Sequence, residues 1–266
     1  IDEVFFALDM NLIPDIHNIF RYLDTIGVSY HMMISESIHS YIDKIHYIEP
    51  ITSSYCGIPM LSFQAVSANH IKIFIKNSIE KIITVLLLFF SFPILILFSI
   101  LVKYTSKGPV LISQELVGLH GRKFHQYKLR SKIIDIDGIN SNNSNIIEQN
   151  RHVITIQKLT KVGKFMRKYS IDTLPQLFNV LKGEMTLIGP HPPFPYQVKE
   201  YNDVQLRRLS MKPGITGLWQ IRSRNKVQDV DQWIIIDLEY IDNWSFLMDF
   251  RIAVKTVSTV LSGTGM

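Results

Sequence analysis

The chain has 266 residues, 47% of them apolar, and a mean hydropathy of +0.14, enough for two modest domains or one large one. Its single cysteine, Cys56, excludes an intramolecular disulfide and a cysteine-based metal site, and we assign it no chemistry. The net charge of +5 is uneven, because residues 151–226 hold 14 Lys and Arg against 4 Asp and Glu. This basic segment predicts an anionic partner, and charge alone leaves nucleic acid, lipid headgroups and a phosphorylated substrate open.

Residues 1 to about 70 alternate strand-like and helix-like runs. Strands are predicted over 4–8 and 28–34, and a helix over 13–26 that ends at Gly27. We expect part of an α/β unit without a nucleotide site, because no G-x-G-x-x-G pattern accompanies it. The chain opens into its first strand without a basic region, which does not fit a signal peptide, and we expect an upstream portion.

An uncharged apolar segment covers residues 82–102. As a helix it would be about 30 Å long, the thickness of a bilayer core. Pro93 lies in its middle and predicts a kink. Two topologies are open: a spanning helix with a tolerated proline, or a bent, re-entrant helix whose ends emerge on one side. Basic residues on both flanks favour re-entrance; they are Lys72, Lys76, Lys81, Lys103 and Lys107.

Shorter elements follow this segment. Strands over 110–115 and 124–130, joined by a turn at 118–121, predict a β-hairpin. Residues 135–150, rich in Asn, Ser and Asp, predict a loop. Helical patterns follow at 159–169, 174–181 and 233–240. An amphipathic stretch at 244–261 fits the membrane interface.

Asp172 lies at a predicted helix start. Thr173 and Gln176 have the spacing of a capping box, and Pro175 suits a first helical turn. The helix dipole and the lysines upstream would keep the Asp172 carboxylate ionised. Such a carboxylate can attack phosphorus, or it can only complement the helix dipole. These residues alone leave both roles open.

A series of short motifs runs in order from about residue 76 to residue 261. It begins with the basic run 76–81 and the proline-containing apolar segment. The later members are Gly108-Pro109-Val110, Gln114, Val117-Gly118, Tyr127-Lys128-Leu129-Arg130-Ser131, Thr160-Lys161-Val162-Gly163-Lys164, Arg167-Lys168-Tyr169-Ser170-Ile171-Asp172, Leu174-Pro175-Gln176-Leu177, Asn179-Val180-Leu181-Lys182-Gly183, Leu187-Ile188-Gly189-Pro190, Lys212-Pro213-Gly214-Ile215-Thr216-Gly217 and Asp237-Leu238-Glu239-Tyr240. In this order they resemble the bacterial sugar transferase family of phosphoglycosyl transferases.

The resemblance implies a mixed α/β fold with two parts. A partial Rossmann-like domain at 1–70 would precede a mainly helical catalytic domain at 76–262, which contains a β-hairpin and a re-entrant membrane helix at 82–102. Ser91 and Pro93 fall at the kink of that helix. The implied location is the cytoplasmic face of the bacterial inner membrane.

The resemblance also implies an activity. The family transfers a sugar 1-phosphate from a UDP-sugar to a polyprenyl (undecaprenyl) phosphate and releases UMP, through an aspartyl phosphosugar intermediate. This reaction serves exopolysaccharide, lipopolysaccharide O-antigen or glycoconjugate synthesis, with Mg²⁺ as cofactor. The implied partners are a UDP-sugar, polyprenyl phosphate and membrane lipid, and a homo-oligomer is compatible with them. Nucleic acid is not expected, because an apolar segment is present and no aromatic-interleaved basic motif is.

Candidate site residues follow from the motif positions. Asp172 falls on the nucleophile and would also contact the metal ion, and Arg167 falls on a phosphate-binding arginine. Lys128 and Arg130 fall on a basic pair that contacts substrate. The run Gly189-Pro190-His191-Pro192 falls on the family's Pro-Arg-Pro nucleotide-binding turn.

The chain also departs from the family pattern. Thr173 replaces the glutamate that follows the nucleophile, and His191 replaces the arginine of the turn; a histidine is only partly charged at neutral pH. Lys132 stands where methionine is usual and Lys158 where arginine is usual. Two functions therefore stay open: a phosphoglycosyl transferase, or a catalytically impaired relative that acts as a membrane-bound binding or scaffold protein.

Overall fold

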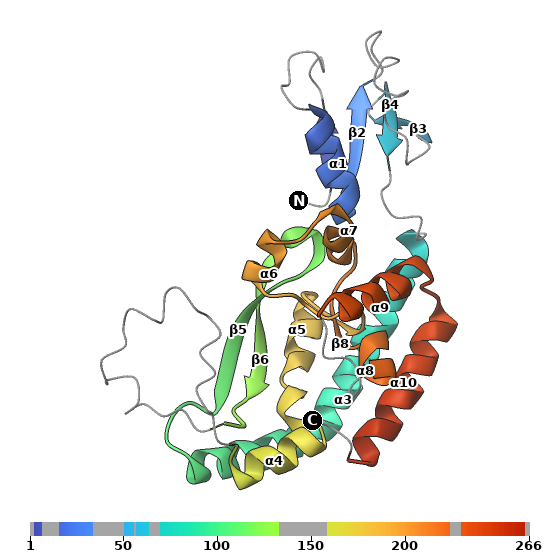
Figure 1. The fold of residues 1–266 in the computed structure, drawn as a ribbon. Coiled ribbons are helices and arrows are strands. Elements are labelled where there is room, and N and C mark those ends of the chain that lie inside the picture. Colours follow the sequence, from blue (N-terminus) through green and yellow to red (C-terminus); the bar gives the residue numbers. More distant parts are fainter. Residues whose placement is uncertain are drawn as a thin grey trace, which may run out of the picture.

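The computed structural model describes residues 3–6, 16–33, 51–55, 57–63, 70–132, 159–223 and 230–263. The predicted loop over 135–150, together with Cys56 and Lys158, lies outside the described residues. Within them the fold is mixed α/β, as predicted, with small sheets and one long apolar helix (Figure 1).

The N-terminal unit is a four-stranded sheet in the order β1-β2-β4-β3 with one helix. β1 (Glu3–Phe6) and β2 (Ser29–Met33) run parallel and are joined by α1 (Ile16–Ile26). β3 (Ile51–Tyr55) and β4 (Ile58–Phe63) form an antiparallel hairpin, and β4 pairs antiparallel with β2. The predicted strand–helix–strand unit is confirmed. The sheet as a whole is mixed, and the Rossmann-like assignment stays a prediction.

Aromatic rings fill the core of this unit. The Tyr30 ring stacks between those of Phe20 and Phe63, with centroid distances of 5.1 and 5.0 Å. Val117 and Leu209, which lie far along the sequence, belong to the same buried cluster. The N-terminal unit therefore shares its core with the rest of the chain, and Figure 1 shows α1 ending beside α7 (Asp203–Leu206).

The long apolar helix is α3 (His70–Thr105), and it contains Pro93. Figure 1 shows that it changes direction along its course, so that its C-terminal part runs beneath the body of the molecule beside α4 (Lys161–Lys168). Among the described residues, it is the one helix long and apolar enough to cross a membrane, with a mean hydropathy of 2.9 and little of that stretch buried. Large apolar side chains such as Phe74, Phe89 and Phe90 are more than 70% exposed.

Both halves of α3 pack on the same body. In the first half, Lys76 Nζ donates to Asp249 Oδ2 of α10 (Phe246–Leu261) at 2.6 Å. In the second half, Phe98 stacks on Phe165 of α4, with ring centroids 5.8 Å apart. Leu129 and Met166 complete this second contact.

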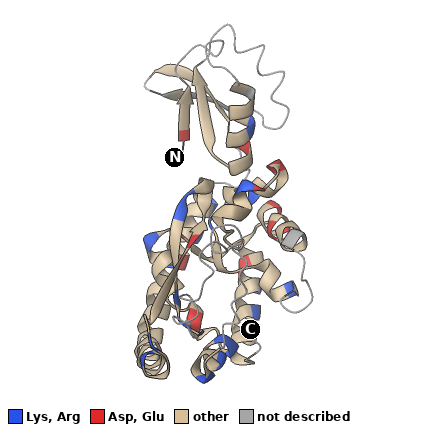
Figure 2. Ribbon diagram, turned by 60° about the vertical axis from the view of Figure 1, so that its left-hand side comes forward, with Lys and Arg blue, Asp and Glu red and all other residues tan. Residues whose placement is uncertain are grey.

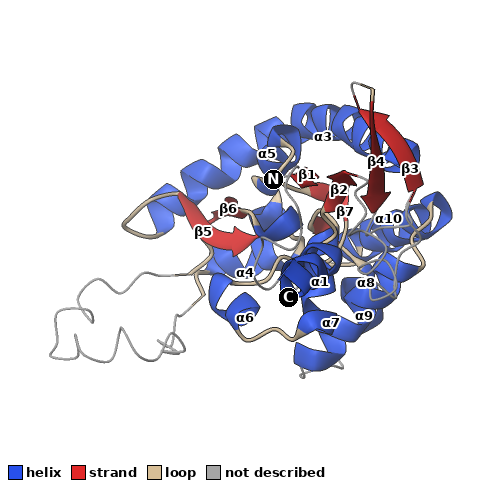
Figure 3. Ribbon diagram, turned by 90° about the horizontal axis from the view of Figure 1, so that it is seen from above, coloured by secondary structure: helices blue, strands red, loops and turns tan. Residues whose placement is uncertain are grey.

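The predicted hairpin is confirmed. β5 (Leu111–Val117) and β6 (Lys123–Leu129) pair antiparallel around the short 3₁₀ turn η3 (Leu119–Gly121). The predicted helices are also present, and the remaining elements are η5 (Ile171–Thr173), α5 (Gln176–Lys182), α6 (Pro195–Lys199), η6 (Arg207–Ser210), α8 (Leu218–Ser223), α9 (Val230–Asp242) and the parallel pair β7 (Thr186–Ile188) and β8 (Gly214–Thr216). Figure 3 shows the hairpin at one side of the molecule and α8, α9 and α10 at the other.

Several basic residues form a cationic end of the molecule. Figure 2 shows Lys and Arg at several places, with a cluster at the end farthest from the N-terminal unit. The exposed lysines there are Lys103, Lys107, Lys161, Lys164 and Lys168. The cationic end thus coincides with the second half of the apolar helix.

Candidate active site

A sharp turn between α4 and α5 presents Asp172. Thr160 caps α4, and its Oγ1 accepts a hydrogen bond of 2.7 Å from the Gly163 amide. After α4, Ser170 adopts a left-handed conformation with φ 54° and ψ 27°. Such a conformation is strained for a residue with a side chain and is typical of functional turns. It reverses the chain immediately before η5, which carries Asp172.

The predicted capping box at Thr173 is wrong. The Thr173 hydroxyl donates to the Ser170 carbonyl at 2.7 Å, and α5 starts after Pro175 without a side-chain cap. The reason is that η5 runs directly into α5, so that most of the first amide groups already find carbonyl partners in the preceding turn. Thr173 instead stabilises the turn that carries Asp172.

A cavity of about 510 Å³ opens beside this turn between η5 and the hairpin. Asp172 is the one carboxylate in its described lining, and four cationic residues also line it: Lys128, Arg130, Lys132 and Arg167. Polar groups complete the wall, among them Gln114, Gln126, Ser131 and Thr173. The cavity therefore combines one potential nucleophile with strong positive charge, which suits an anionic substrate.

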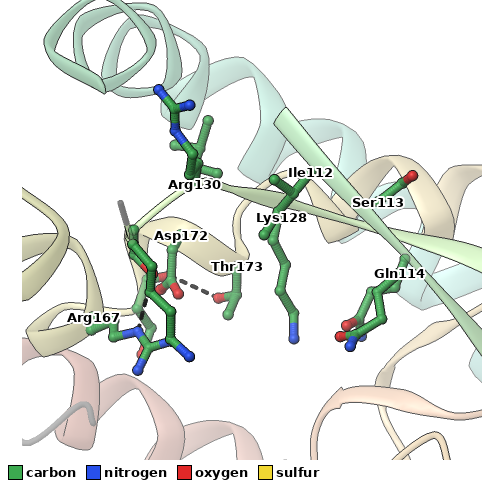
Figure 4. A pocket seen from close by; sticks show the side chains of 13 residues that line it. Ile112, Ser113, Gln114, Lys128, Arg130, Arg167, Asp172 and Thr173 are labelled. Atoms are coloured by element: carbon green, nitrogen blue, oxygen red, sulfur yellow. Dashed lines mark hydrogen bonds between the residues drawn. The ribbon is translucent and has the colours of Figure 1, made fainter. Parts of the chain in front are cut away.

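Lys128 and Arg167 face the cavity from two elements. Figure 4 shows their nitrogen atoms directed to the same open side, with Asp172 and Thr173 behind them. Arg167 Nε donates to Ser131 Oγ at 3.1 Å. Burial lowers the pKa of Lys128, Asp172 opposes that effect and Arg167 adds to it. Lys128 is thus close enough to respond to both groups.

Gly163 brings α4 close to the end of β6. A Cβ at this position would lie 1.9 Å from the Ser131 carbonyl oxygen, a contact no side chain tolerates. The missing side chain lets the two backbones meet, and one turn later along α4 Arg167 reaches the Ser131 hydroxyl. The glycine therefore sets the distance between Arg167 and the hairpin.

The side chain of Arg130 lies apart from that of Lys128, although the sequence analysis predicted that the two form a basic pair at the substrate. Its side chain is 2% exposed, and its two terminal nitrogens donate to the carbonyls of Ser106 and Lys107 at 2.7 and 2.6 Å. Figure 4 shows its guanidinium directed away from the ammonium group of Lys128 and the guanidinium of Arg167. In this arrangement Arg130 fastens the end of α3 to the hairpin, and its contact with substrate stays a prediction.

The predicted nucleotide-binding turn, residues 189–192, follows β7. The Gly189 amide donates to the Thr216 carbonyl and the Gly214 amide to the Pro190 carbonyl, both at 2.9 Å. The His191 amide donates to Asp237 Oδ2 at 3.1 Å, and its ring lies edge-on to Trp219 with centroids 5.2 Å apart. The turn is therefore held at the end of the β7–β8 pair by backbone contacts.

The sequence analysis expected the His191 side chain to be partly charged at neutral pH, and the structure differs. Burial, with the positive charges of Arg208 and Lys128, lowers the pKa of its imidazole to about 3. The ring is therefore neutral at physiological pH and can serve as a hydrogen-bonding group. Lys128 thus acts electrostatically on both Asp172 and His191, although residues 189–192 are not among the described lining of the cavity.

The sequence analysis assigned no role to two residues behind the turn, Arg208 and Asp237. Arg208 Nη2 donates to Asp237 Oδ2 at 2.7 Å, and both side chains are buried. Burial raises the pKa of Asp237 to about 6, which Arg208 and the His191 amide oppose. The sequence could not single out Arg208, because its neighbour Arg207 is chemically identical yet exposed and paired with Asp242.

The residues at the cavity can be compared with the needs of Mg²⁺. In the part of the chain that the structure describes, no three His, Cys, Asp or Glu side chains form a metal cluster. Magnesium in phosphoryl-transfer sites often takes one or two carboxylates and completes its shell with water and substrate phosphates. Asp172, with neighbouring hydroxyls and the Gln114 amide, fits that minimum.

Comparison with known proteins identifies the family of this chain. The sequence model of the bacterial sugar transferase family matches residues 71–263, which include the cavity, the turn and α3. The chain belongs to the bacterial sugar transferase family.

Three relatives illustrate the family. Galactosyl transferase CpsE of Streptococcus agalactiae is 46% identical over 164 residues, which are 59% of this chain and 36% of that protein. The undecaprenyl-phosphate galactose phosphotransferase of Salmonella typhimurium is 31% identical over 280 residues, 97% of this chain and 57% of that protein. The UDP-glucose:undecaprenyl-phosphate glucose-1-phosphate transferase of Klebsiella pneumoniae is 34% identical over 213 residues, 77% and 44% respectively. The chain thus spans between about a third and just over half of these relatives.

Proposed function

We propose that this chain transfers a sugar 1-phosphate from a UDP-sugar to a polyprenyl phosphate, with Asp172 as the nucleophile. The observation that carries the proposal is the placement of Asp172 on a strained turn, as the one carboxylate in the described lining of a cavity rich in cations. The names of the Salmonella and Klebsiella relatives describe transfer to or from undecaprenyl phosphate and support the acceptor class. The Klebsiella name also supports a UDP-sugar donor.

The first step forms a covalent intermediate. A carboxylate oxygen of Asp172 attacks the phosphorus that bears the sugar, and the bond from that phosphorus to the bridging oxygen breaks. UMP leaves with the bonding electrons, and an aspartyl phosphosugar remains. In the second step an oxygen of the polyprenyl phosphate attacks the same phosphorus. The Asp172 carboxylate is released and a polyprenyl diphosphate sugar forms.

Lys128 and Arg167 would hold the donor diphosphate. Both line the same cavity as Asp172 and direct their cationic groups to its open side. Charge that builds on the phosphoryl oxygens is stabilised by such fixed cations, more strongly in a partly dry site than in water. The hydrogen bond from Arg167 to Ser131 keeps its guanidinium in place before the substrate arrives.

The turn 189–192 would contact the nucleotide part of the donor. Because its imidazole is neutral, His191 would contribute a hydrogen bond or ring contact in place of the bidentate charge grip of an arginine. Mg²⁺, when bound, would neutralise diphosphate charge, with Asp172 as its protein carboxylate.

Membrane attachment supports the lipid acceptor. The exposed apolar side chains of α3 and the lysines at the same end of the molecule fit a lipid surface with anionic headgroups. Both ends of α3 are bonded to the same body, Lys76 to Asp249 and the Ser106 carbonyl to Arg130. This arrangement supports a re-entrant helix that places the cavity close to the bilayer surface.

UMP release provides the test. Purified protein in detergent, with Mg²⁺, polyprenyl phosphate and a panel of UDP-sugars, should release UMP and form a phosphosugar adduct detectable by intact-protein mass spectrometry. Asp172→Asn should abolish both, because an amide cannot form the intermediate. Asp203→Asn, a change at an exposed aspartate paired with Arg21, is the matched control and should retain activity.

The alternative is a silent relative that binds donor without turnover, which the replacement of the second carboxylate by Thr173 favours. It predicts UDP binding without UMP release or adduct for every sugar tested. That outcome would overturn the transferase proposal for this chain.

A further inference from the structure

Two adjacent residues of the short 3₁₀ helix η6, Arg208 and Leu209, are buried in different parts of the molecule. Leu209 is 1% exposed and belongs to the core of the N-terminal unit, with Phe20 and Val28. Arg208 is 6% exposed and reaches the turn 189–192 instead. Because the two residues are adjacent in sequence, a displacement of one moves the other.

Arg208 contacts the backbone carbonyl of His191 directly and its amide through Asp237. Its Nη2 donates to the His191 carbonyl at 2.9 Å and to Asp237 Oδ2 at 2.7 Å. The same Asp237 oxygen accepts the His191 amide at 3.1 Å. One buried ion pair thus fixes the peptide groups on either side of the His191 ring. Arg208 Nη1 also donates to the Tyr201 hydroxyl at 2.6 Å, which restricts the guanidinium further.

In η6, Leu209 is the residue buried in the core of the N-terminal unit, where it lies in one cluster with Val117 of β5 and the partly buried Leu206 of α7. α1 packs against η6 and α7. Within the described residues, the charged pair across this contact, Arg21 with Asp203, joins two side chains that are more than half exposed. Exposed pairs contribute little. A fully buried leucine contributes more, so the apolar contact dominates the joint in the described part of the chain.

We infer that Arg208 is the positioning residue of the turn 189–192, and that the N-terminal unit holds Arg208 in place through Leu209. The unit then acts as a support for donor binding without contacting the donor. This inference rests on the proposed function for the role of the turn, while the mechanical coupling can be measured without turnover.

Amide hydrogen exchange tests the coupling directly. The segment 189–195 contains four prolines, so that Gly189, His191 and Phe194 carry its only amide hydrogens. Of these, the His191 amide is bonded to Asp237. Leu209→Ala should speed exchange in this segment, and Arg208→Lys should do so as well, because lysine cannot reproduce the fork of donors. Met32→Ala is the matched control, since Met32 is fully buried in the same unit on β2, whose far end points away from α7 (Figure 1).

Kinetics then separate positioning from folding. At temperatures well below melting, Leu209→Ala and Arg208→Lys should raise the KM for the UDP-sugar about tenfold with little change in kcat, because a displaced turn weakens donor binding. Met32→Ala should lower the melting temperature comparably and leave KM unchanged. The coupling would be overturned if Leu209→Ala left both the amide protection of residues 189–195 and the KM unchanged. It would also be overturned if Met32→Ala changed both quantities as much as Leu209→Ala does. Faster exchange in Leu209→Ala without any UMP release from the parent would sustain the coupling and reject the proposed function instead.

Discussion

At the scale of single residues, the site is a carboxylate surrounded by cations. The second acid of the family pattern is absent, and Thr173 uses its hydroxyl on the Ser170 carbonyl. The other charged residues in the described lining of the cavity are therefore all cationic: Lys128, Arg130, Lys132 and Arg167. Excess positive charge favours binding of a diphosphate, yet it also weakens the nucleophile by attracting its electrons.

A second carboxylate should therefore improve the reaction. We expect Thr173→Glu to raise UMP release at saturating Mg²⁺, because the new charge offsets the cations and offers the metal a further oxygen. Thr173→Val, which only removes the hydroxyl, should destabilise the turn by about 1 kcal/mol and lower activity. The rate of UMP release by the parent and both variants, measured across a Mg²⁺ titration, tests this prediction. A parent rate equal to that of Thr173→Glu would mean that the second acid is dispensable here.

His191 should give the protein an acid-sensitive stability. Its pKa in the folded state, about 3, lies below the ordinary 6.5, so between these values the unfolded chain binds a proton that the folded chain rejects. Stability should therefore fall as pH decreases through this window. His191→Gln should reduce that fall, whereas His125→Gln, at an exposed position on β6, should preserve it. Melting temperatures in detergent between pH 7 and 4 measure both variants, and an equal acid loss in parent and His191→Gln would contradict a neutral ring.

At the scale of elements, a buried polar network joins α3 to the C-terminal helices. Lys76 Nζ donates to Glu80, Asp249 and the Ile188 carbonyl at 2.6, 2.6 and 3.0 Å. The Tyr240 hydroxyl donates to Asp249 at 2.6 Å. Glu80 in turn accepts the Leu187 amide of β7 at 2.8 Å. The network thus ties the first half of α3 to the strand that leads into the turn 189–192.

Breaking this network should destabilise the whole catalytic part. Lys76→Met leaves two buried carboxylates without their cation, and such losses amount to about 3–5 kcal/mol. Lys72→Met, one turn earlier at an exposed position, is the control and should change little. Thermal unfolding in detergent compares the two. Equal melting temperatures would show that the network contributes no net stability.

Elements with a local pattern were predictable, and contacts between distant segments were not. The alternation of β5 and β6 with glycines between them fixed the hairpin to within about two residues of its observed bounds. The helix spacing likewise gave α1, α4 and α10. The ion pair of Arg208 with Asp237 joins residues 29 positions apart and depends on how η6 meets α9. The failed capping box has a local cause, because the 3₁₀ turn immediately before α5 had no sequence pattern that would predict it.

At the scale of the whole molecule, α3 determines how the protein meets a membrane. Lys76, near its start, is bonded to α10, and Ser106 and Lys107, just past its end, are bonded to Arg130 at the end of the hairpin. If the helix crossed the bilayer fully, one of these contacts would have to lie on the opposite side from the rest of the body. The proposed re-entrant course removes that conflict, because a bend in α3, which contains Pro93, would let both ends return to one face (Figure 1).

Labelling from one side of the membrane tests this topology. In a Cys56→Ser background, Lys72→Cys and Lys107→Cys each add one exposed thiol, before and after the apolar segment. A maleimide that cannot cross the bilayer should label both in inside-out vesicles and neither in right-side-out vesicles. Pro93→Leu should restore the missing helical hydrogen bond, straighten α3 and let a fraction of molecules expose the two positions on opposite sides. Opposite-side labelling already in the protein with Pro93 would establish a spanning helix, and the contacts of Lys76 with Asp249 and of Arg130 with Ser106 could not then coexist.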